Sequence, residues 1–376
     1  MTPLKIALLS PYHTGSHRAW AEGYRRHSRH DVRLFSLPGR FWKWRMHGGA
    51  VTLASAYRES GFAADLLLAT DMLDLTTFLA LTRDLTAGLP VALYMHENQL
   101  TYPLPADGST GPMRRQKGER DRHYVFVNYA SMLSAGRVFF NSRHHQEALL
   151  GALPAFLRHF PDFHELQSVE EIAARSTVLP VGVEFARLLP AAQPPAGQPP
   201  LILWNQRWEY DKNPQAFFSA LYTVAGEGLP FRVALCGERF RRRPEEFDEA
   251  LEKLGGRVIH AGFAPQEQYR RLLWEATLTI STAVHEFFGI SILEAIYCHT
   301  FPILPNRLSY PELLPAQYHR DCLYEDDEGL LARLRWALAY PEAARSVAQA
   351  MHPHVAAYDW TAVATHYDVA LAGLAI

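Results

Sequence analysis

The chain has 376 residues, of which 48% are hydrophobic and 12% aromatic. This composition excludes a disordered, a fibrous and a small disulfide-stapled protein. The length exceeds the roughly 250–300 residues at which a single hydrophobic core stops growing, so two domains are expected. The 37 lysines and arginines nearly balance the 39 aspartates and glutamates, and the formal net charge of −2 by itself indicates no polyanionic partner.

The two halves of the chain differ in charge. Residues 1–190 carry 21 basic and 17 acidic side chains, whereas residues 191–376 carry 16 and 22. The first sixty residues alone hold 10 basic against 3 acidic side chains. This asymmetry predicts a basic face in the N-terminal half and an anionic partner on that side.

The cysteines and the apolar runs of the sequence bear on the cellular compartment of the protein. Cys236, Cys298 and Cys322 are far apart and lack the spacing of a disulfide framework or of a metal site. The first residues lead into a short apolar run with no cleavage-type segment, and no apolar stretch approaches the ~20 residues that cross a bilayer. We expect a cytoplasmic protein that does not enter a membrane.

Short apolar runs alternate with helical patterns through the first half of the chain. This alternation is typical of βαβ units and of a parallel sheet that is covered by helices on both faces. The predicted strands are Ile6–Ser10, Val32–Leu37, Leu66–Thr70, Val91–Met95, Val138–Asn141 and Val178–Val181. The first domain is expected to span residues 1–188.

The same pattern starts again after Leu189–Pro200, a segment rich in Pro, Ala and Gln that indicates a linker. The second set of predicted strands is Leu201–Asn205, Phe231–Cys236, Val258–His260, Leu278–Ser281 and Phe301–Leu304. We therefore expect a second doubly wound α/β domain over residues 201–355. The helical pattern near the C-terminus is interrupted at His352-Pro353, and residues 356–376 are expected to form a helix that returns to the first domain.

The sharpest motif follows the predicted strand Leu278–Ser281 and enters a helix near Gly289. Backbone N–H groups at a helix start bind phosphate, and glycine allows a ligand to approach the backbone closely. Glu286 and Glu294 form an E-x7-E pattern in which one carboxylate is placed to hold sugar hydroxyls and the other to reach a ribose diol. The alternative interpretation is a capped helix with two solvated acids.

A second loop, directly after the strand Leu201–Asn205, carries Arg207 and Lys212. Arginine can fork two phosphate oxygens and lysine supplies a point charge, so both are placed to converge on a diphosphate. Two solvated cations are the alternative.

Together these two loops resemble the donor site of retaining family 4 glycosyltransferases. The resemblance implies that Arg207 and Lys212 bind the nucleotide diphosphate, that Glu286 and Glu294 bind the sugar and the ribose, and that the backbone around Gly289 contributes. It also implies the GT-B architecture of two Rossmann-like α/β domains facing a cleft. Further donor-binding candidates are Phe288 and Ile290 beside Gly289, and Gly15 and Ser16 in the first domain.

Motifs of the first domain narrow this resemblance. They are the loop Gly15-Ser16-His17, the block Arg40-Phe41-Trp42-Lys43-Trp44-Arg45, the segment His96-Glu97-Asn98-Gln99-Leu100 and the strand end Phe140-Asn141-Ser142. With the donor motifs they resemble the tRNA-queuosine mannosyltransferase family from Ile6 to about Pro315. The resemblance implies transfer of mannose from GDP-mannose to the cyclopentenediol of queuosine at the tRNA wobble position (tRNA-Asp type), with retention of configuration.

The block of basic and aromatic residues has a chemical rationale of its own. Exposed aromatic rings stack on unpaired bases while arginine and lysine hold phosphates. We expect acceptor contacts from Arg40, Trp42, Lys43, Trp44 and Arg45, although Trp42 and Trp44 alternate as in a strand and could pack inward. A second basic run, Arg114, Arg115, Lys117, Arg120 and Arg122, lies nearby, and the segment Pro105–Lys117 is expected to be a mobile acceptor loop.

Residues at strand ends of the first domain complete the candidate site. His96 is predicted to be catalytic, with Arg207, Lys212 and Glu286, because its imidazole can orient the acceptor hydroxyl or the reacting sugar. The alternative is a structural histidine. The other acceptor-binding candidates are His17, Glu97, Asn98, Asn141 and Ser142; Asn141 and Ser142 could equally cap the next helix.

No cofactor is expected. The histidines form no H-E-x-x-H pattern, and arginine, lysine and a helix dipole can neutralise the leaving diphosphate without a metal. The expected partners are the nucleotide-sugar donor and queuosine-containing tRNA, with no membrane and no obligate protein partner. Two alternatives stay open: a GT-B enzyme that acts on a glycan or lipid acceptor, and a non-catalytic tRNA-binding protein.

Overall fold

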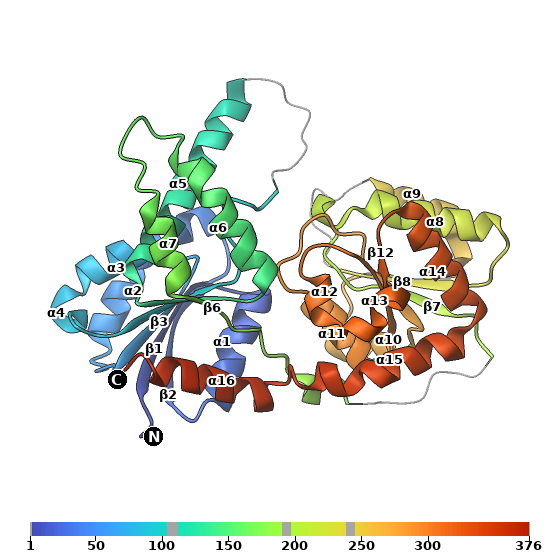
Figure 1. The fold of residues 1–376 in the computed structure, drawn as a ribbon. Helices are drawn as coiled ribbons and strands as arrows, with labels where there is room; N and C mark the ends of the chain where they lie inside the picture. Colours follow the sequence, from blue (N-terminus) through green and yellow to red (C-terminus); the bar gives the residue numbers. More distant parts are fainter. Residues whose placement is uncertain (1, 104–111, 190–196, 238–244, 376) are drawn as a thin grey trace. The chain divides into compact units, whose positions relative to one another are not determined.

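The structure is a computed structural model that describes residues 2–103, 112–189, 197–237 and 245–375. The chain divides into two compact units (Figure 1). The first comprises residues 1–183 and 360–376, and the second comprises residues 184–359. In the described part of the chain, no helix is both long and apolar enough to cross a bilayer.

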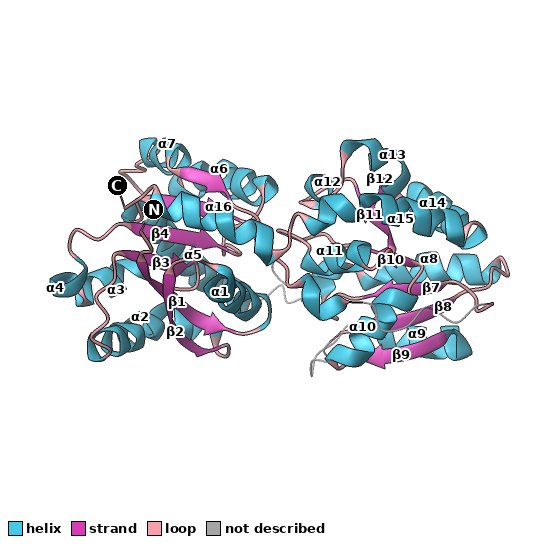
Figure 2. Cartoon of the chain, turned by 90° about the horizontal axis from the view of Figure 1, so that it is seen from below, coloured by secondary structure: helices cyan, strands magenta, loops and turns pink. Residues whose placement is uncertain are grey.

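The first unit contains a parallel sheet in the order β2-β1-β3-β4-β5-β6, six strands within the described residues. Its central strands are buried on both faces because helices cover both sides of the sheet (Figure 2). The strands are β1 (Lys5–His13), β2 (Asp31–Pro38), β3 (Leu66–Thr70), β4 (Val91–Met95), β5 (Arg137–Phe140) and β6 (Ser176–Val178). The helices are α1 (Gly15–His27), α2 (Trp42–Glu59), α3 (Leu75–Leu81), α4 (Arg83–Thr86), α5 (Pro112–Ser134), α6 (Arg143–Leu157), α7 (Gln167–Ala174) and α16 (Trp360–Ala372).

Helix α16, at the end of the chain, belongs to the first unit. Its Asp368 side chain accepts hydrogen bonds from the Tyr24 hydroxyl (3.0 Å), the Ser28 hydroxyl (2.6 Å) and the backbone N–H of Arg29 (3.0 Å). The buried Trp360 ring lies against Gly23 and Gly182, where a Cβ atom would come within about 2 Å of it. The last helix therefore completes the core of a unit that begins at the N-terminus.

The second unit repeats the architecture with the sheet order β12-β11-β10-β7-β8-β9, again six parallel strands within the described residues. The strands are β7 (Leu201–Trp204), β8 (Arg232–Cys236), β9 (Val258–Gly262), β10 (Leu278–Ile280), β11 (Phe301–Pro305) and β12 (Leu323–Tyr324). The helices are α8 (Pro214–Gly226), α9 (Glu246–Leu254), α10 (Gln266–Glu275), α11 (Ile290–Tyr297), α12 (Tyr310–Leu313), α13 (His319–Cys322), α14 (Asp327–Ala339) and α15 (Pro341–Ala356), with 3₁₀ turns η1 (Phe185–Leu188), η2 (Tyr210–Lys212), η3 (Gly255–Arg257) and η4 (Ala316–Tyr318).

The junction before the linker differs from the expected boundary at residue 188. The turn η1 belongs to the second unit, where the Phe185 ring stacks on Tyr297 at 4.2 Å and the Trp274 indole N–H donates to the Leu188 carbonyl (2.6 Å). Most of the expected linker, residues 190–196, lies outside the described residues.

One local expectation, the helix break at His352-Pro353, and one alternative, the strand-like alternation of Trp42 and Trp44, are wrong. Helix α15 runs through Pro353, and the break before α16 falls at residues 357–359. Trp42 and Trp44 lie in the first turn of α2 and not in a strand, because the alternation of large and basic residues also fits the start of a helix. The two-residue strand β12 has no apolar run long enough to predict it.

Candidate functional site

The predicted donor residues lie at the carboxyl edge of the second sheet. Strand β7 pairs with both β8 and β10, so the chain winds away in opposite directions from this point, where open α/β sheets bind ligands. The loops after β7 and after β10 are joined here. The Val284 N–H donates to the Asp211 carbonyl (2.9 Å), and the Thr282 hydroxyl donates to the Lys212 carbonyl (2.9 Å).

Lys212 contacts residues of both loops at this edge. Its side chain is only 6% exposed, and its ammonium donates to the His285 carbonyl (2.8 Å) and lies 3.3 Å from Oε2 of Glu286. Asp211 lies behind it, with Oδ2 3.2 Å from the same nitrogen. A buried lysine with three oxygen partners is held in one position, which prepares a fixed positive charge for an anionic ligand.

Glu286 is the carboxylate partner of this lysine. Burial alone raises the pKa of its carboxyl, but the Lys212 charge and a hydrogen bond from the Phe288 N–H (3.2 Å) outweigh that effect and leave the pKa below its ordinary value. Glu286 is therefore ionised at neutral pH and can only accept hydrogen bonds, as a holder of sugar hydroxyls must.

Arg207 lies in the same loop as Lys212 but in a different environment. Its side chain is 51% exposed and pairs with Glu209 at 3.1 Å. The loop thus supplies one buried and one exposed cation.

The start of helix α11 supports the predicted role of the backbone. Gly289 has a φ of 105° and precedes the first helical residue, Ile290. A Cβ atom at Gly289 would meet a Leu313 methyl group at 2.9 Å, so both backbone conformation and space require glycine. Both backbone groups of Phe288 have partners within the protein, because its carbonyl accepts from the Ser309 hydroxyl (2.9 Å) and its N–H donates to Glu286 (3.2 Å). Ile290 is the first residue of the helix, and its backbone remains the predicted contributor at this helix N-terminus.

Glu294 already has partners that the sequence did not predict. Its side chain is buried, one oxygen pairs with Arg187, and the other accepts a hydrogen bond from the Tyr269 hydroxyl (2.7 Å). Arg187 is 107 residues away in the chain, and no motif marked either partner. A ribose diol that reaches Glu294 has to share it with these groups.

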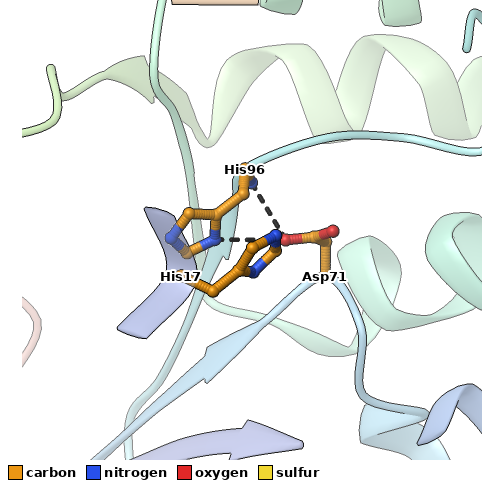
Figure 3. Close-up of side chains that lie close together, drawn as sticks. All are labelled: His17, Asp71 and His96. Atoms are coloured by element: carbon orange, nitrogen blue, oxygen red, sulfur yellow. Dashed lines mark hydrogen bonds and ion pairs between the residues drawn. The ribbon is translucent and has the colours of Figure 1, made fainter. Parts of the chain in front are cut away.

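The carboxyl edge of the first sheet brings three further side chains together (Figure 3). His17 is in the first turn of α1, Asp71 directly follows β3, and His96 directly follows β4. Oδ1 of Asp71 accepts a hydrogen bond from the His96 backbone N–H (2.9 Å) and lies 3.3 Å from Nδ1 of its ring. The structure thus places the predicted His17 and His96 side by side and adds Asp71, which only its position at a strand end could have indicated.

Burial changes the pKa values of this cluster. It lowers the pKa of the His96 imidazole to about 3, because the charged form loses its hydration. Burial also raises the pKa of the Asp71 carboxyl, an effect that His17 and the backbone N–H of His96 oppose. His17, Asp71 and His96 are also a group whose candidate metal-ligand atoms lie within 4.8 Å of one another.

The remaining strand-end candidates have internal hydrogen-bond partners. Asn141 donates to the His96 carbonyl (2.9 Å), and its own carbonyl lies 2.8 Å from Nδ1 of His145. Ser142 caps α6 by accepting from the His145 N–H (3.0 Å), which is the alternative that its position suggested. These contacts fix the loop behind His96, and neither side chain is exposed.

Glu97 and Asn98 form the loop after β4. Asn98 is fully buried and its carbonyl accepts from the N–H groups of Leu100 (3.0 Å) and Thr101 (2.8 Å). Glu97, half-buried, accepts from the Gln99 amide (3.2 Å). Asn98 therefore shapes this loop, and Glu97 is the member of the pair with a partly accessible carboxylate.

Gly15 and Ser16 are exposed at the start of α1, next to the buried His17. Gly15 has a φ of 51° with open space around its α-carbon, so conformation and not crowding favours glycine there. The turn is placed as a source of backbone N–H groups at a helix start.

The block of basic and aromatic residues forms the beginning of α2. Phe41 is 73% and Trp44 62% exposed, whereas Trp42 packs against Tyr124 at 5.2 Å. The Lys43 ammonium lies 5.2 Å from the Trp42 ring. Of the neighbouring arginines, Arg40 is exposed and Arg45 donates to the Pro38 carbonyl (3.0 Å).

Most side chains of the second basic run lie outside the described residues. Residues 105–111 lie outside the described residues, and so do the side chains of residues 112–121, although the backbone of α5 begins at Pro112. Arg122, the last member of the run, contacts His159.

Comparison with known proteins identifies the family. A model for the tRNA-queuosine alpha-mannosyltransferase N-terminal domain matches residues 5–183, and one for glycosyl transferases group 1 matches residues 187–351. A tRNA-queuosine alpha-mannosyltransferase from Drosophila melanogaster is 33% identical over 342 residues, which cover 88% of this chain and 85% of that protein.

Solved structures share the fold at low sequence identity. Sucrose-phosphate synthase from Thermosynechococcus elongatus has a TM-score of 0.72 at 16% identity over 99% of both chains. The catalytic domain of starch synthase IV from Arabidopsis thaliana, bound to ADP and acarbose, has a TM-score of 0.76 at 12% identity over 100% of both. This likeness shows the GT-B fold of two Rossmann-like units, while the sequence relationship shows that the chain belongs to the tRNA-queuosine alpha-mannosyltransferase family.

Proposed function

We propose that the protein transfers mannose from GDP-mannose to the cyclopentenediol of queuosine in tRNA, with retention of the anomeric configuration. The observation that carries the proposal is the ion pair between buried Lys212 and partly exposed Glu286, beside Arg207, in a chain of this family. It combines fixed positive charge for a diphosphate with a carboxylate for sugar hydroxyls on one sheet edge.

The second unit is proposed to hold the donor. Arg207, Lys212 and the start of α11 neutralise the charge that develops on the departing diphosphate, and Glu286 accepts hydrogen bonds from mannose hydroxyls. Arg187 and Tyr269, which donate to the Glu294 carboxylate, orient it for hydrogen bonds from the ribose hydroxyls. Because these cations supply the positive charge, no resident metal is part of the proposal.

The reaction is proposed to be a same-face substitution. The bond from the anomeric carbon to the diphosphate oxygen breaks as the bond to a diol oxygen forms on the same face. The diol proton passes to the departing diphosphate oxygen, so that no covalent enzyme intermediate is required.

The first unit is proposed to present the tRNA. Phe41 and Trp44 are large, exposed rings that can stack on unpaired bases, with Arg40 and Lys43 beside them for phosphates. A cytoplasmic location follows from this substrate and agrees with the three buried free thiols.

The experiment is nucleoside mass spectrometry of queuosine-containing tRNA-Asp after incubation with the protein and GDP-mannose. We expect a gain of one hexose on queuosine. R207A should abolish the gain, whereas R271A, which changes an exposed arginine on α10, should retain it. Equal transfer by R207A and the wild type would refute the diphosphate clamp.

The alternatives predict other outcomes. Donor binding or slow donor hydrolysis without transfer to tRNA would indicate a glycan or lipid acceptor. Salt-dependent tRNA binding without donor binding would indicate a non-catalytic tRNA-binding protein.

A further inference from the structure

Three aromatic rings pack against the His96 ring. The Trp20 ring meets it edge-on at 4.7 Å, the Tyr94 ring lies 4.7 Å away, and the His17 ring stacks on it at 4.4 Å. Its carbonyl is held by Asn141 at 2.9 Å. A ring packed in this way cannot turn over without opening the core around it.

One carboxylate oxygen of Asp71 makes two hydrogen-bond contacts with His96, one to its backbone and one to its ring. Oδ1 accepts the His96 backbone N–H at 2.9 Å and faces Nδ1 of the ring at 3.3 Å. Because the imidazole is neutral, only one of its nitrogens carries a proton, and a carboxylate next to Nδ1 selects the tautomer with the proton on Nδ1. The lone pair then belongs to Nε2.

Nε2 of His96 is left unsatisfied. It is buried and, among the described residues, has no hydrogen-bond partner. An unpaired buried polar atom destabilises the folded state, and a hydrogen bond from a hydroxyl donor removes that penalty. The arrangement therefore prepares a rigid acceptor for a hydroxyl hydrogen.

We propose that Asp71 is a positioning residue of the transfer reaction, which holds His96 as the Nδ1-protonated tautomer so that Nε2 accepts a hydrogen bond from a substrate hydroxyl. The inference rests on the proposed function for the identity of the substrates. The hydroxyl belongs either to the donor sugar or to the acceptor diol, and both are polyols of the same hydrogen-bonding chemistry.

The ring geometry favours this role over a metal site. The lone pairs of an imidazole lie in the plane of its ring, and the planes of His17 and His96 are only 26° apart at 4.4 Å. The lone pairs of stacked rings lie in two nearly parallel planes, so a single ion cannot lie in the plane of both rings. Nδ1 of His96, the atom nearest Asp71, is also occupied by the hydrogen bond to that carboxylate.

The first test reads the tautomer directly and does not depend on activity. Long-range ¹H–¹⁵N spectra of the protein labelled in its histidine rings are compared for the wild type, D71N and D74N, with His96 signals assigned by their loss in H96Q. D74N is the matched control, because Asp74 is a nearby carboxylate that caps α3 and does not contact His96.

We expect a protonated Nδ1 and an unprotonated Nε2 for His96 in the wild type and in D74N. D71N keeps the size of the side chain but presents both an acceptor and a donor, so mixed tautomers are expected. A proton on Nε2 in the wild type, or an unchanged pattern in D71N, would overturn the proposal. One equivalent of bound transition metal in the wild type that is missing from D71N would also overturn it.

The second test uses kinetics. D71N should lower kcat at least tenfold, and a rise of KM for GDP-mannose or for tRNA tells whether the sugar or the diol supplies the hydroxyl. The titratable groups that face Asp71 are His17 from α1 and His96 and Tyr94 from β4 and its end. The acid limb of the wild-type pH profile should disappear in D71N and persist in D74N.

The two tests separate the two proposals. If the wild type shows no mannose transfer, the proposed function fails while the spectra still decide the tautomer. Wild-type transfer with an unchanged kcat in D71N refutes the role of Asp71 alone.

Discussion

The Nζ atom of Lys212 and Oε2 of Glu286 lie 3.3 Å apart although the residues are 74 positions apart in the chain. One follows β7 and the other follows β10, and these strands are neighbours in the sheet. Their charges are therefore arranged by the backbone before any ligand binds, which reduces the reorganisation that a bound diphosphate and sugar require.

K212A should remove donor binding and lower kcat by about 10²–10³-fold. The variant loses the fixed charge at the diphosphate and also leaves the partly buried Glu286 without its cation, which raises the pKa of that carboxyl. Calorimetric titration with GDP and transfer kinetics measure both effects. K253A, which changes an exposed lysine on α9, is the control, and a normal affinity for GDP in K212A would contradict the prediction.

G289A should destabilise the second unit by about 1–2 kcal/mol and weaken donor binding. Alanine is strained at a φ of 105°, and its methyl group would press on Leu313. Urea unfolding gives the stability. The control is G226A, at a helical position with open space, which should be neutral or slightly stabilising; equal effects of both changes would show that the conformation of Gly289 is unimportant.

F41A and W44A should weaken tRNA binding by about tenfold or more each, since stacking contributes about 1–3 kcal/mol per base. Both rings are largely exposed, so the free energy of unfolding should change little. R40A should instead lower the salt dependence, with a slope smaller by about 0.7 per lost phosphate contact. Filter binding across a salt series measures both quantities, and Y340A, at an exposed ring in the second unit, should bind normally.

The stability of the protein should depend on the ionisation of His96. Its pKa is lowered to about 3, below the value of about 6.5 in an unfolded chain, so the unfolded state binds a proton that the folded state does not. The contribution of neutral His96 is present above pH 6.5 and is lost, at about 1.4 kcal/mol per pH unit, as the pH falls toward 3.

Urea unfolding of H96Q and the wild type at pH 7, 6 and 5 checks this dependence. Asp71, whose pKa is raised, changes the stability with pH in the opposite sense. The quantity of interest is therefore the difference in unfolding free energy between H96Q and the wild type, taken at each pH. H366Q, a change at an exposed position of α16, is the control. A constant difference between H96Q and the wild type at all three values would contradict the prediction.

The buried strands were the most predictable part of the fold. Leu66–Thr70 and Val91–Met95 have the predicted bounds, because continuous apolar runs between polar residues leave little choice of register. The same logic placed Lys212 and Glu286 at one edge, since the carboxyl ends of neighbouring parallel strands meet. Strand β6 lies at Ser176–Val178 and not at Val178–Val181, because an edge strand with few apolar residues gives a weaker pattern.

Contacts that depend on distant segments were not predictable. Arg187 pairs with Glu294 only because η1 returns to α11, and nothing in the local pattern of either residue indicates the partner. Asp71 follows a predicted strand, but a single aspartate at a strand end is common. Its contact with His96 depends on the pairing of β3 with β4, which places the ends of these two strands next to each other and to α1.

The return of α16 has a consequence for biosynthesis. Residues 184–359 form one uninterrupted unit and can reach their native fold while the chain is still being made. The first unit cannot, since Tyr24, Ser28 and Arg29 find their carboxylate partner, Asp368, only when the last residues leave the ribosome. A chain that is cut before α16 is therefore expected to keep a folded second unit and to leave the first unit without its Asp368 contacts.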